Sequence, residues 1–495
     1  MTVVSDDQGR YAFPADRLEP GRYTVKIRAV GYVLSGPHEI AVTADGASAD
    51  LTLDPTANIP PQLTNSEWLA SMPGSELEKG AIENCGTCHK LSLPLSSTYT
   101  MEELRDDALP RMGIMTSQSF PLAVQRRVVE STRARAAEAT ERLARYIASV
   151  NLSGSPTWKY SFKPFPRPKG AATRVIITSY ELPRKSMQPH DAVRDDKGYV
   201  WISNFGENSL SRLDPKTGEV KKYRYPALLS EEYANGNLDL EFDRDGNIWL
   251  GLMNQTGVAK FDPTSETFKF FPLPKDMRDD RSQQAMVAPV NSHVDGKVWM
   301  NDAEHAAITR VDITTGKYDP WFFPFKDMAV GERHGAYGLY TDSQNNAYVL
   351  DFPSEYIWKV DAKTGASTAF KTPTPNSRPR RGRMDSQDRL WFAEWGASKV
   401  AMLDTKTGTF TEWPVPGTHI APYDAMIDKN GWIWTNNMED DKVTRIHAES
   451  GNAIQYLMPV ETNARRVSVD NSEARPVLWV GSNHQALVMK VEPLE

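Results

Sequence analysis

An aromatic residue recurs at intervals of 43 to 50 residues between positions 201 and 479 of the chain. Each one lies in a short apolar run, after a turn such as Asp195-Asp196-Lys197-Gly198 and before a strand that ends in a second turn such as Asp214-Pro215-Lys216-Thr217-Gly218. The recurring residues are Trp201, Trp249, Trp299, Tyr348, Trp391, Trp434 and Trp479. Units of this length, with four strands and no helices, are typical of β-propeller blades. Seven units predict a seven-bladed propeller over residues 173–495.

The seventh unit stops short of a fourth strand, because the chain ends soon after Val488-Met489-Lys490-Val491. The β-rich run from Arg174 to Pro183 precedes the first unit and resembles the strand that ends that unit. We therefore expect residues 174–183 to supply the missing outer strand. Closing the ring in this way hides its exposed edges.

Residues that would line the channel of such a propeller are polar. The position eleven residues before each recurring aromatic and the position three after it are expected to face the axis, since the first strand of a blade lines the channel. These positions include His190, Tyr337, Arg380, Glu394 and Tyr423, which we take as candidate catalytic residues. Together they could hold an anion or polarise a carbonyl group. The alternative is that they are polar only because water fills the channel.

The motifs Pro189-His190-Asp191 and Trp391-Phe392-Ala393-Glu394, with the Asn/Asp-Gly turns, resemble the virginiamycin B lyase family of seven-bladed propellers. The resemblance implies a catalytic His and Glu that act with Mg²⁺ to open a cyclic depsipeptide by elimination. Glu394 occupies the matching Trp-x-x-Glu motif, but Arg380 stands fourteen residues earlier, where the His is expected. Arginine is a poor general base near neutral pH. His190 and Asn204 have the same spacing in another blade, which leaves a rearranged site open.

The only two cysteines lie in Cys85-Gly86-Thr87-Cys88-His89. Two thiols at this spacing can bond covalently to the vinyl groups of a haem, and the histidine that follows can ligate the iron. A thioredoxin-like pair and half of a zinc site are the alternatives, but neither a βαβ pattern nor two further ligands at short spacing is present nearby. The motif predicts one covalent haem c, attached through Cys85 and Cys88, with His89 as an iron ligand.

The stretch from 66 to 152 resembles a c-type cytochrome, a small all-α domain. Helices are predicted at 66–71, 76–84 and 102–109, the last stopped by Pro110, followed by a long helix from about 122 to 150. A Met thioether opposite the histidine would raise the potential of the haem. Met112 is the expected distal ligand and metal-binding residue, with Met115 second and an open distal position third.

Residues 1–55 alternate between apolar and polar residues and contain turn sequences such as Glu19-Pro20-Gly21. The run Asp7-x-Gly9-x-Tyr11-x-Phe13 with Pro20-Gly21-x-Tyr23 resembles the carboxypeptidase-regulatory-like domain, a transthyretin-like β sandwich. The resemblance implies an accessory role, and the first strands of that family are missing here. Residues 153–172 are proline-rich and carry four aromatic residues, so we expect an extended linker along a surface.

The composition limits the partners and the compartment. A net charge of −7 argues against a nucleic-acid partner, and no apolar stretch is long enough to span a bilayer. No signal peptide follows Met1. The c-type resemblance nevertheless implies an exported, periplasmic protein, so the natural chain is expected to begin upstream.

Three functions stay open from the sequence. The first is an oxidoreductase in which the propeller binds a small organic substrate and the haem passes electrons to another cytochrome. The second is a lyase of the virginiamycin B type with an appended cytochrome, and the third is a non-enzymatic electron-transfer protein. The run Arg378-Pro379-Arg380-Arg381-Gly382-Arg383 predicts either a docking patch for an acidic redox partner or a solvated loop.

Overall fold

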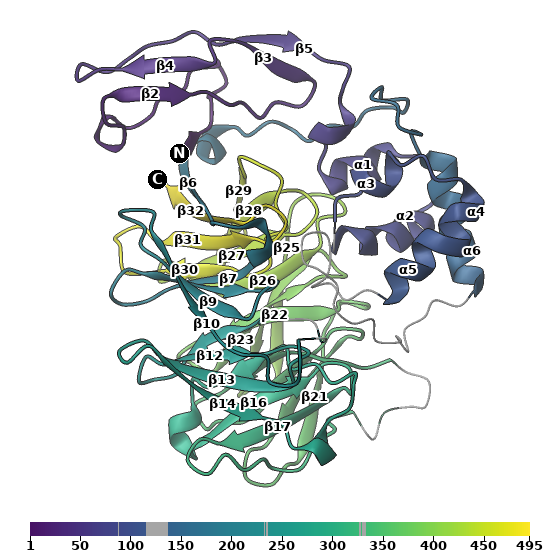
Figure 1. The fold of residues 1–495 in the computed structure, drawn as a ribbon, viewed down its shortest axis with the longest axis vertical. Coiled ribbons are helices and arrows are strands. Elements are labelled where there is room, and N and C mark those ends of the chain that lie inside the picture. Colours follow the sequence, from purple (N-terminus) through teal and green to yellow (C-terminus); the bar gives the residue numbers. More distant parts are fainter. Residues whose placement is uncertain (88, 115–136, 232, 234–235, 326–327, 329–332) are drawn as a thin grey trace.

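The computed structural model describes the chain except residues 88, 115–136, 232, 234–235, 326–327 and 329–332. It is mainly β, and seven antiparallel sheets form the blades of a propeller, as predicted. Figure 1 shows the propeller with the N-terminal strands above it and a group of helices beside it.

The blades are numbered here in chain order. Blade 1 has β7 (Pro189–Arg194), β8 (Val200–Asn204), β9 (Ser209–Leu213) and β10 (Val220–Arg224); blade 2 has β11 (Leu240–Phe242), β12 (Ile248–Gly251), β13 (Gly257–Asp262) and β14 (Thr267–Pro272); blade 3 has β15 (Val287–Ala288), β16 (Lys297–Asp302) and β17 (Ala307–Asp312). Blade 4 has β18 (Ala336–Thr341), β19 (Ala347–Asp351), β20 (Tyr356–Val360) and β21 (Ser367–Lys371); blade 5 has β22 (Pro379–Met384), β23 (Arg389–Glu394), β24 (Lys399–Asp404) and β25 (Thr409–Pro414). Blade 6 has β26 (Pro422–Ile427), β27 (Trp432–Asn437), β28 (Lys442–His447) and β29 (Ala453–Leu457); blade 7 has β30 (Ser468–Asp470), β31 (Val477–Ser482), β32 (Leu487–Pro493) and β6 (Val175–Glu181).

The recurring aromatic residues lie on the second strand of each blade, and a hydrogen bond explains why several of them are tryptophan. The indole N–H donates to the aspartate that opens the preceding turn, in the pairs Trp201–Asp195 (2.8 Å), Trp249–Asp243 (2.9 Å), Trp391–Asp385 (2.9 Å) and Trp434–Asp428 (2.8 Å). The other carboxylate oxygen of Asp195 accepts from two backbone N–H groups of the turn. One aspartate thus fixes both the turn and the buried ring.

Blade 7 is closed by the two ends of the propeller segment. β6 pairs with β32 from Glu181 opposite Leu487 to Val175 opposite Pro493, which confirms the predicted closure. β1 (Thr2–Val3) then pairs with β6 at the outer edge of the same sheet. The N-terminus of the chain therefore covers an edge that would otherwise expose unpaired backbone groups.

Blade 3 departs from the predicted four strands, because its sheet has three. The segment that would form the outer strand contacts β17 through the isolated bridges Ile308–Phe322 and Val311–Tyr318 and the ion pair between Arg310 and Asp319, without forming a continuous ladder. Pro320 lies between these bridges. Proline has no N–H to donate to a ladder, so a regular strand is not expected there.

The N-terminal β strands form two separate ladders. β2 (Gly21–Thr24) pairs with β4 (Glu39–Val42), and β3 (Tyr32–Gly36) pairs with β5 (Thr52–Pro55). No residue from 1 to 59 is fully buried. The prediction of β structure is confirmed, but the ladders enclose no buried core, and the predicted sandwich stays a prediction.

The helical segment contains α1 (Asn65–Ser71), α2 (Glu76–Glu83), α3 (Ser92–Leu95), α4 (Met101–Glu103), a π-helical turn (Leu104–Ala108), α5 (Leu109–Ile114) and α6 (Ala137–Val150). A capping box of Thr64 and Glu67 starts α1. The first two predicted helices are confirmed, and so is the last from residue 137. Its predicted start lies outside the described residues.

Pro110 does not stop the third predicted helix, which continues to Ile114 as α5. The backbone N–H of Leu109 bonds the carbonyl of Leu104, five residues back. This π turn changes the hydrogen-bond register just before the proline, so the missing N–H of Pro110 breaks no α-helical bond that the preceding turn requires.

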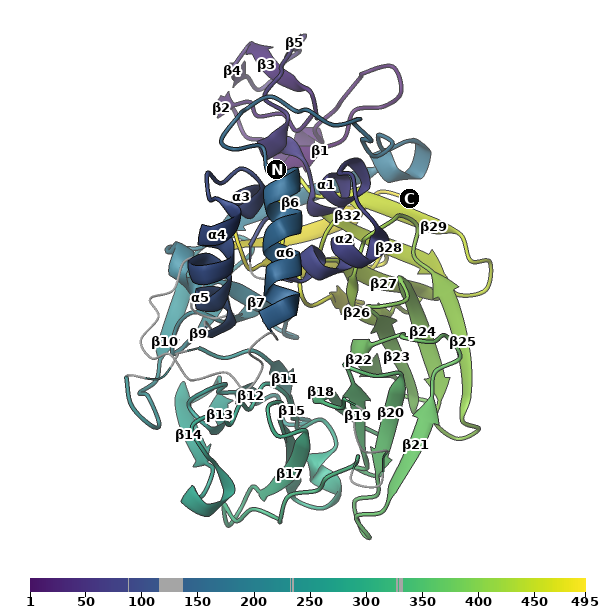
Figure 2. The same cartoon turned by 90° about the vertical axis from the view of Figure 1, so that its right-hand side faces the viewer.

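The helical segment has its own core of apolar residues and packs against the propeller (Figure 2). Trp68, Ile82, Leu143 and Ile147 are buried in that core. The linker lies along it, because the Trp158 ring meets Trp68 edge to face at 4.9 Å and the Tyr160 hydroxyl donates to the Val150 carbonyl. Trp158 and Tyr160 therefore join this segment to the helical core. No helix in the described ranges is long and apolar enough to cross a membrane.

Candidate functional site

The innermost strands of four blades carry a bulge at the same place. Register shifts occur between Pro189 and Ala192, Ala336 and Gly338, Pro379 and Gly382, and Pro422 and Ala425. A bulge leaves extra residues unpaired and re-aims their side chains. Two consecutive side chains, such as His190 and Asp191, are therefore buried near the axis together, which a strictly alternating strand would not allow.

Four of the five candidate catalytic residues come together at these bulges. The Tyr423 hydroxyl is 3.3 Å from Nε2 of His190 and also hydrogen-bonds the Tyr337 hydroxyl. The Arg380 guanidinium lies over the Tyr423 ring at 4.3 Å and over the Tyr337 ring at 5.5 Å. Strands of blades 1, 4, 5 and 6 thus contribute to one site.

His190 is held as a neutral ring. Its Nδ1 is 2.7 Å from a carboxylate oxygen of Asp191, so Nδ1 carries the proton and Nε2 is the acceptor for the Tyr423 hydroxyl. Burial lowers the pKa of His190 to about 3, against the opposing pull of Asp191. Burial also raises the pKa of Tyr423 above its ordinary value. Both groups are neutral at physiological pH.

Glu394 does not join the other four residues. It is the last residue of β23, and the charged side chains that act on it are Glu412 and Lys399 on the outer strands of blade 5. Burial, with the nearby Glu412, raises the pKa of Glu394 to about 8. Asn204, the equivalent residue in blade 1, likewise donates to Ser209 and Ser211 on the next strand of its own blade. Asn204 thus bonds within its own blade.

We expect Glu394→Gln to change how stability depends on pH. The folded protein holds a proton on Glu394 that the unfolded chain releases above a pKa of about 4.5. Wild type therefore loses stability relative to the variant as pH rises from about 5 to 8. Melting temperatures across this range measure the effect. Glu266→Gln is the control, because that exposed carboxylate has a lowered pKa and its difference from wild type is constant above pH 5; a constant difference for Glu394→Gln would contradict the assignment.

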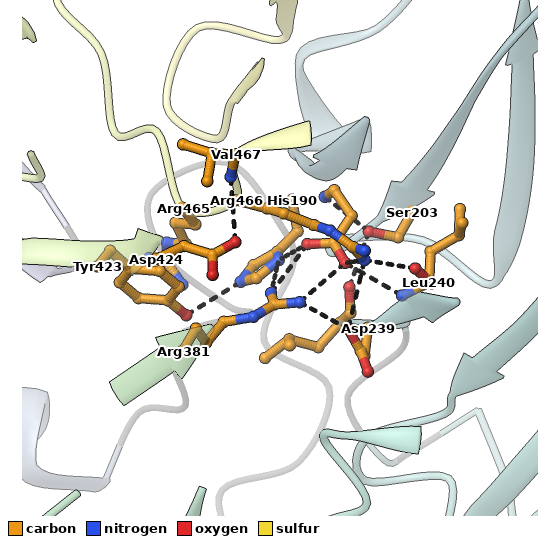
Figure 3. A network of polar contacts seen from close by, with 12 residues as sticks. His190, Ser203, Asp239, Leu240, Arg381, Tyr423, Asp424, Arg465, Arg466 and Val467 are labelled. Carbon is orange, nitrogen blue, oxygen red and sulfur yellow. Dashed lines mark hydrogen bonds and ion pairs between the residues drawn. The ribbon is translucent and has the colours of Figure 1, made fainter. Parts of the chain in front are cut away.

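Beside the tyrosines lies a buried ionic network that the sequence did not predict (Figure 3). Arg381 forms ion pairs with Asp191 at 3.0 Å and with Asp239 at 2.6 Å, and none of the three is exposed to solvent. Arg466 adds a pair with Asp191 at 2.7 Å. Burial alone would raise the pKa of Asp191, but the guanidinium groups of Arg381 and Arg466 hold it well below its usual range.

The aspartates of this network also join neighbouring blades. Asp191 accepts from the backbone N–H of Leu240, Asp239 from that of Val287, and Asp424 from that of Val467. Each bond links the inner strand of one blade to that of the next. The network therefore has a structural role around the axis in addition to setting the charge of the site.

The predictions for the arginine run at 378–383 were wrong, because it is neither a surface docking patch nor a solvated loop. Most of it forms β22, the innermost strand of blade 5, where Arg381 is fully buried and Arg380 is 8% exposed. The acids that neutralise Arg381 lie in blades 1 and 2, far away in the sequence. The sequence of the run itself could not identify these acids.

The Cys85–His89 motif packs against loops of the propeller. Gly86 lies so close to Glu439, in the loop after β27, that a Cβ added to it would be 2.2 Å from the carboxylate. Asn463 donates to the Gly86 carbonyl at 3.3 Å, and Lys90 pairs with Glu461 at 2.5 Å. Asn65 in α1 donates to the Glu439 carboxyl at 2.7 Å.

The described residues of the motif fit a haem on one side. The His89 ring is largely buried, and its Nδ1 is 2.9 Å from the carbonyl of Lys90. That bond places the lone pair of a neutral ring on Nε2, the atom a histidine offers to iron. Cys85 packs against the apolar core of the helical segment. Cys88 lies outside the described residues.

The distal side is less well matched. Met112 lies in α5 and is 37% exposed, whereas an iron ligand is normally enclosed by protein and haem. Met115 lies outside the described residues. In the described ranges no three His, Cys, Asp or Glu side chains converge as a set of metal ligands, so the Mg²⁺ expected for the lyase hypothesis has no recognisable site there.

Known proteins match this chain in structure and not in sequence. No family model matches it, and no curated protein matches it either. Virginiamycin B lyase from Staphylococcus aureus superposes with a TM-score of 0.54 at 19% identity, over 64% of this chain and 99% of that one. A streptogramin B lyase superposes with a TM-score of 0.55 at 18% identity, over 66% of this chain and 99% of that one. The chain therefore contains a propeller of this fold.

Proposed function

We propose that this chain is an exported c-type haem protein that oxidises a small organic substrate at the mouth of the propeller channel. The observation that carries the proposal is the contact between the Cys85–His89 motif and the residues that border the site. Glu439 touches Gly86, and the next residue, Met438, has its sulfur 3.6 Å from Nη1 of Arg380. Arg380 in turn covers Tyr423. Among the described residues, contacts therefore lead from Gly86 through Glu439, Met438 and Arg380 to Tyr423.

The side chains at the axis can move a proton inward. Tyr337 is half-buried, whereas Tyr423 and His190 are fully buried, so Tyr337 is the member of the series that a substrate hydroxyl meets first. A proton taken from that hydroxyl passes along the hydrogen-bonded series of Tyr337, Tyr423 and Nε2 of His190. Because burial lowers the pKa of His190 to about 3, the ring relays the proton and does not hold it. Arg380 holds the substrate in place and does not act as a base.

A haem held by Cys85, Cys88 and His89 would supply a one-electron acceptor beside this site. Oxidation of a hydroxyl to a carbonyl releases two electrons, which would pass one at a time to an external cytochrome, and two protons, of which one leaves along the tyrosines and the other to solvent. Because bacteria attach haem covalently outside the cytoplasm, the proposal makes this a periplasmic protein. The partner is another c-type cytochrome, and no nucleic acid is involved. The N-terminal ladders serve as an accessory module.

The direct test mixes the oxidised holoprotein, without oxygen, with candidate alcohols, phenols and hydroxy acids. We expect one class to produce the reduced haem spectrum together with an oxidised product. If none of these compounds reduces the haem, the non-enzymatic electron-transfer function is favoured instead.

Gly86→Ala tests whether the contact with Glu439 matters. The added methyl group must displace the Glu439 carboxyl, which is 1% exposed and held by Asn65. We expect substrate-driven haem reduction to slow about tenfold or more, and the double variant with Glu439→Ala to recover, because the methyl group then has room. Glu439→Ala alone measures the cost of losing the Asn65 bond.

Gly80→Ala is the matched control, since a Cβ at Gly80 meets nothing within 4 Å. An equal effect of Gly80→Ala and Gly86→Ala on the reduction rate would show that the contact between Gly86 and Glu439 does not control electron transfer.

The alternative is a lyase with an appended cytochrome. It is favoured by the propeller fold shared with virginiamycin B lyase and by the hydrogen bond between His190 and Asp191, which leaves Nε2 of His190 as a proton acceptor. It is disfavoured by Arg380 at the expected histidine position and by the charged neighbours of Glu394, which are Glu412 and Lys399 and none of the other candidates. Mg²⁺-dependent opening of a cyclic depsipeptide by protein with Cys85→Ser and Cys88→Ser would establish it and remove the redox function.

A further inference from the structure

In the described part of the chain Arg380 is a buried cation that forms no ion pair, although the buried Glu439 carboxyl lies within electrostatic reach of it. Arg380 is 8% exposed, its Nε has no hydrogen-bond partner among the described residues, and its Nη1 meets only the Met438 sulfur. Buried charges in proteins are almost always paired, because an unpaired one loses its hydration without compensation. The adjacent Arg381 follows this rule, with two aspartates. Arg380 does not.

Arg378 presents a second guanidinium next to the first. It lies 4.4 Å from the Trp395 ring and 4.6 Å from the Phe352 ring, and within the described ranges it forms no ion pair. Burial and the charge of Arg380 lower its pKa to about 10. Its backbone has a φ of +52°, a strained left-handed conformation for a residue with a side chain. Gln188 and Ala421, the equivalent residues of blades 1 and 6, have the same conformation, so it belongs to the repeat and sets the direction of the Arg378 side chain.

The walls around the two guanidinium groups are aromatic. Arg380 lies 4.5 Å from Phe352 and 4.3 Å from Tyr423, so the two arginines share Phe352. Phe352 meets Trp395 edge to face at 5.9 Å. The indole N–H of Trp395 is buried and has no acceptor in the described part of the chain. The site therefore offers two positive charges, one unused N–H donor and several ring surfaces.

We propose that this site, made by Arg378, Arg380, Phe352 and Trp395, binds an aromatic carboxylate. The carboxylate lies on the two guanidinium groups, which are the donors best matched to it, and accepts from the Trp395 N–H. The ring of the ligand packs against the aromatic walls and reaches toward the Tyr337 hydroxyl. This assignment rests on the proposed function only in naming the substrate of the same channel, since binding is measured without electron transfer.

The test is equilibrium binding of 4-hydroxybenzoate to the oxidised full-length holoprotein, by calorimetry and tryptophan fluorescence. Benzyl alcohol, acetate and inorganic phosphate are the comparison ligands. We expect the aromatic acid to bind at least tenfold more tightly than each of them. Tight binding of phosphate, or equal binding of the neutral alcohol, overturns the assignment, and so does the absence of binding by any aromatic acid.

Arg380→Gln is expected to weaken binding of the acid about thirtyfold or more, which corresponds to the loss of one partner of a buried charge pair. Arg380→Lys is expected to lie between, because it keeps the charge and loses the planar fork. Arg378→Gln is the second variant should Arg380→Gln unfold. Arg389→Gln, in the same blade but paired with Asp385, is the control and should bind as wild type does; unchanged affinity in Arg380→Gln and Arg378→Gln contradicts the proposal.

The two proposals fail separately. Protein with Cys85→Ser and Cys88→Ser is expected to bind 4-hydroxybenzoate as wild type does. If binding and its dependence on Arg380 hold while no bound acid reduces the haem of wild type, the redox function is wrong and the binding site stands. If a neutral alcohol reduces the haem and the acid does not bind, the redox function stands and the carboxylate site is wrong.

Discussion

Arg381→Leu is expected to lower the free energy of unfolding by about 3–5 kcal/mol. The substitution removes the guanidinium that pairs with Asp191 and Asp239 while both carboxylates stay buried. Burial then favours the neutral form of each acid, and Arg466 alone cannot compensate both. Asp191 and Asp239 also accept backbone N–H groups from the following blades, so the substitution weakens the contacts between neighbouring blades as well. Urea denaturation followed by tryptophan fluorescence measures it.

Two controls separate a buried network from a general loss of charge. Lys221→Leu removes an ion pair with Glu266 in which both side chains are more than a third exposed, and it should cost at most about 1 kcal/mol. Arg381→Leu combined with Asp239→Asn should be less destabilised than the sum of the two single variants, because the second change removes one of the stranded charges. Equal losses for Arg381→Leu and Lys221→Leu would show that the network does not hold the propeller together.

The propeller could be predicted from the sequence because its determinants are local. Each turn aspartate and its tryptophan are six residues apart, and the hydrogen bond between them repeats in blade after blade. The closure by β6 was also predictable, since a sheet that lacks one strand has one place from which to take it. Helices α2 and α6 could be predicted for the same reason, from apolar spacing along a single segment.

The site was predictable only in part. His190, Tyr337, Arg380 and Tyr423 were found because they occupy equivalent positions of the repeat. Glu394 was grouped with them because the position three after each recurring aromatic was expected to face the axis, whereas its charged neighbours lie on the outer strands of its own blade.

The acids that pair with Arg381 could not be identified from the sequence, because they are brought to it by ring closure and not by proximity along the chain. The same holds for the contact between Gly86 and Glu439, which lie more than 350 residues apart. The Trp395 and Phe352 rings were missed because they follow the second strands and do not belong to the inner ones.

Haem attachment is the second large effect that we expect, because it depends entirely on two side chains. Protein matured with the cytochrome assembly machinery should carry one haem per chain that resists denaturation and acid extraction. Cys85→Ser or Cys88→Ser should leave at most one thioether bond, and the double variant should lose the covalent haem completely. His89→Ala should keep the thioether bonds but lose the ligand that a buried imidazole provides. Gly80→Ala serves as the control with unchanged haem content.

The central claim is that this motif and the propeller channel act together, and the mass of the intact, denatured protein tests its foundation most directly. We predict that the protein purified from the periplasm has the mass of the polypeptide plus one haem, and that the double cysteine variant has the mass of the polypeptide alone. A wild-type protein that emerges from the same maturation at the mass of the bare polypeptide would contradict the haem assignment and every electron-transfer step built on it.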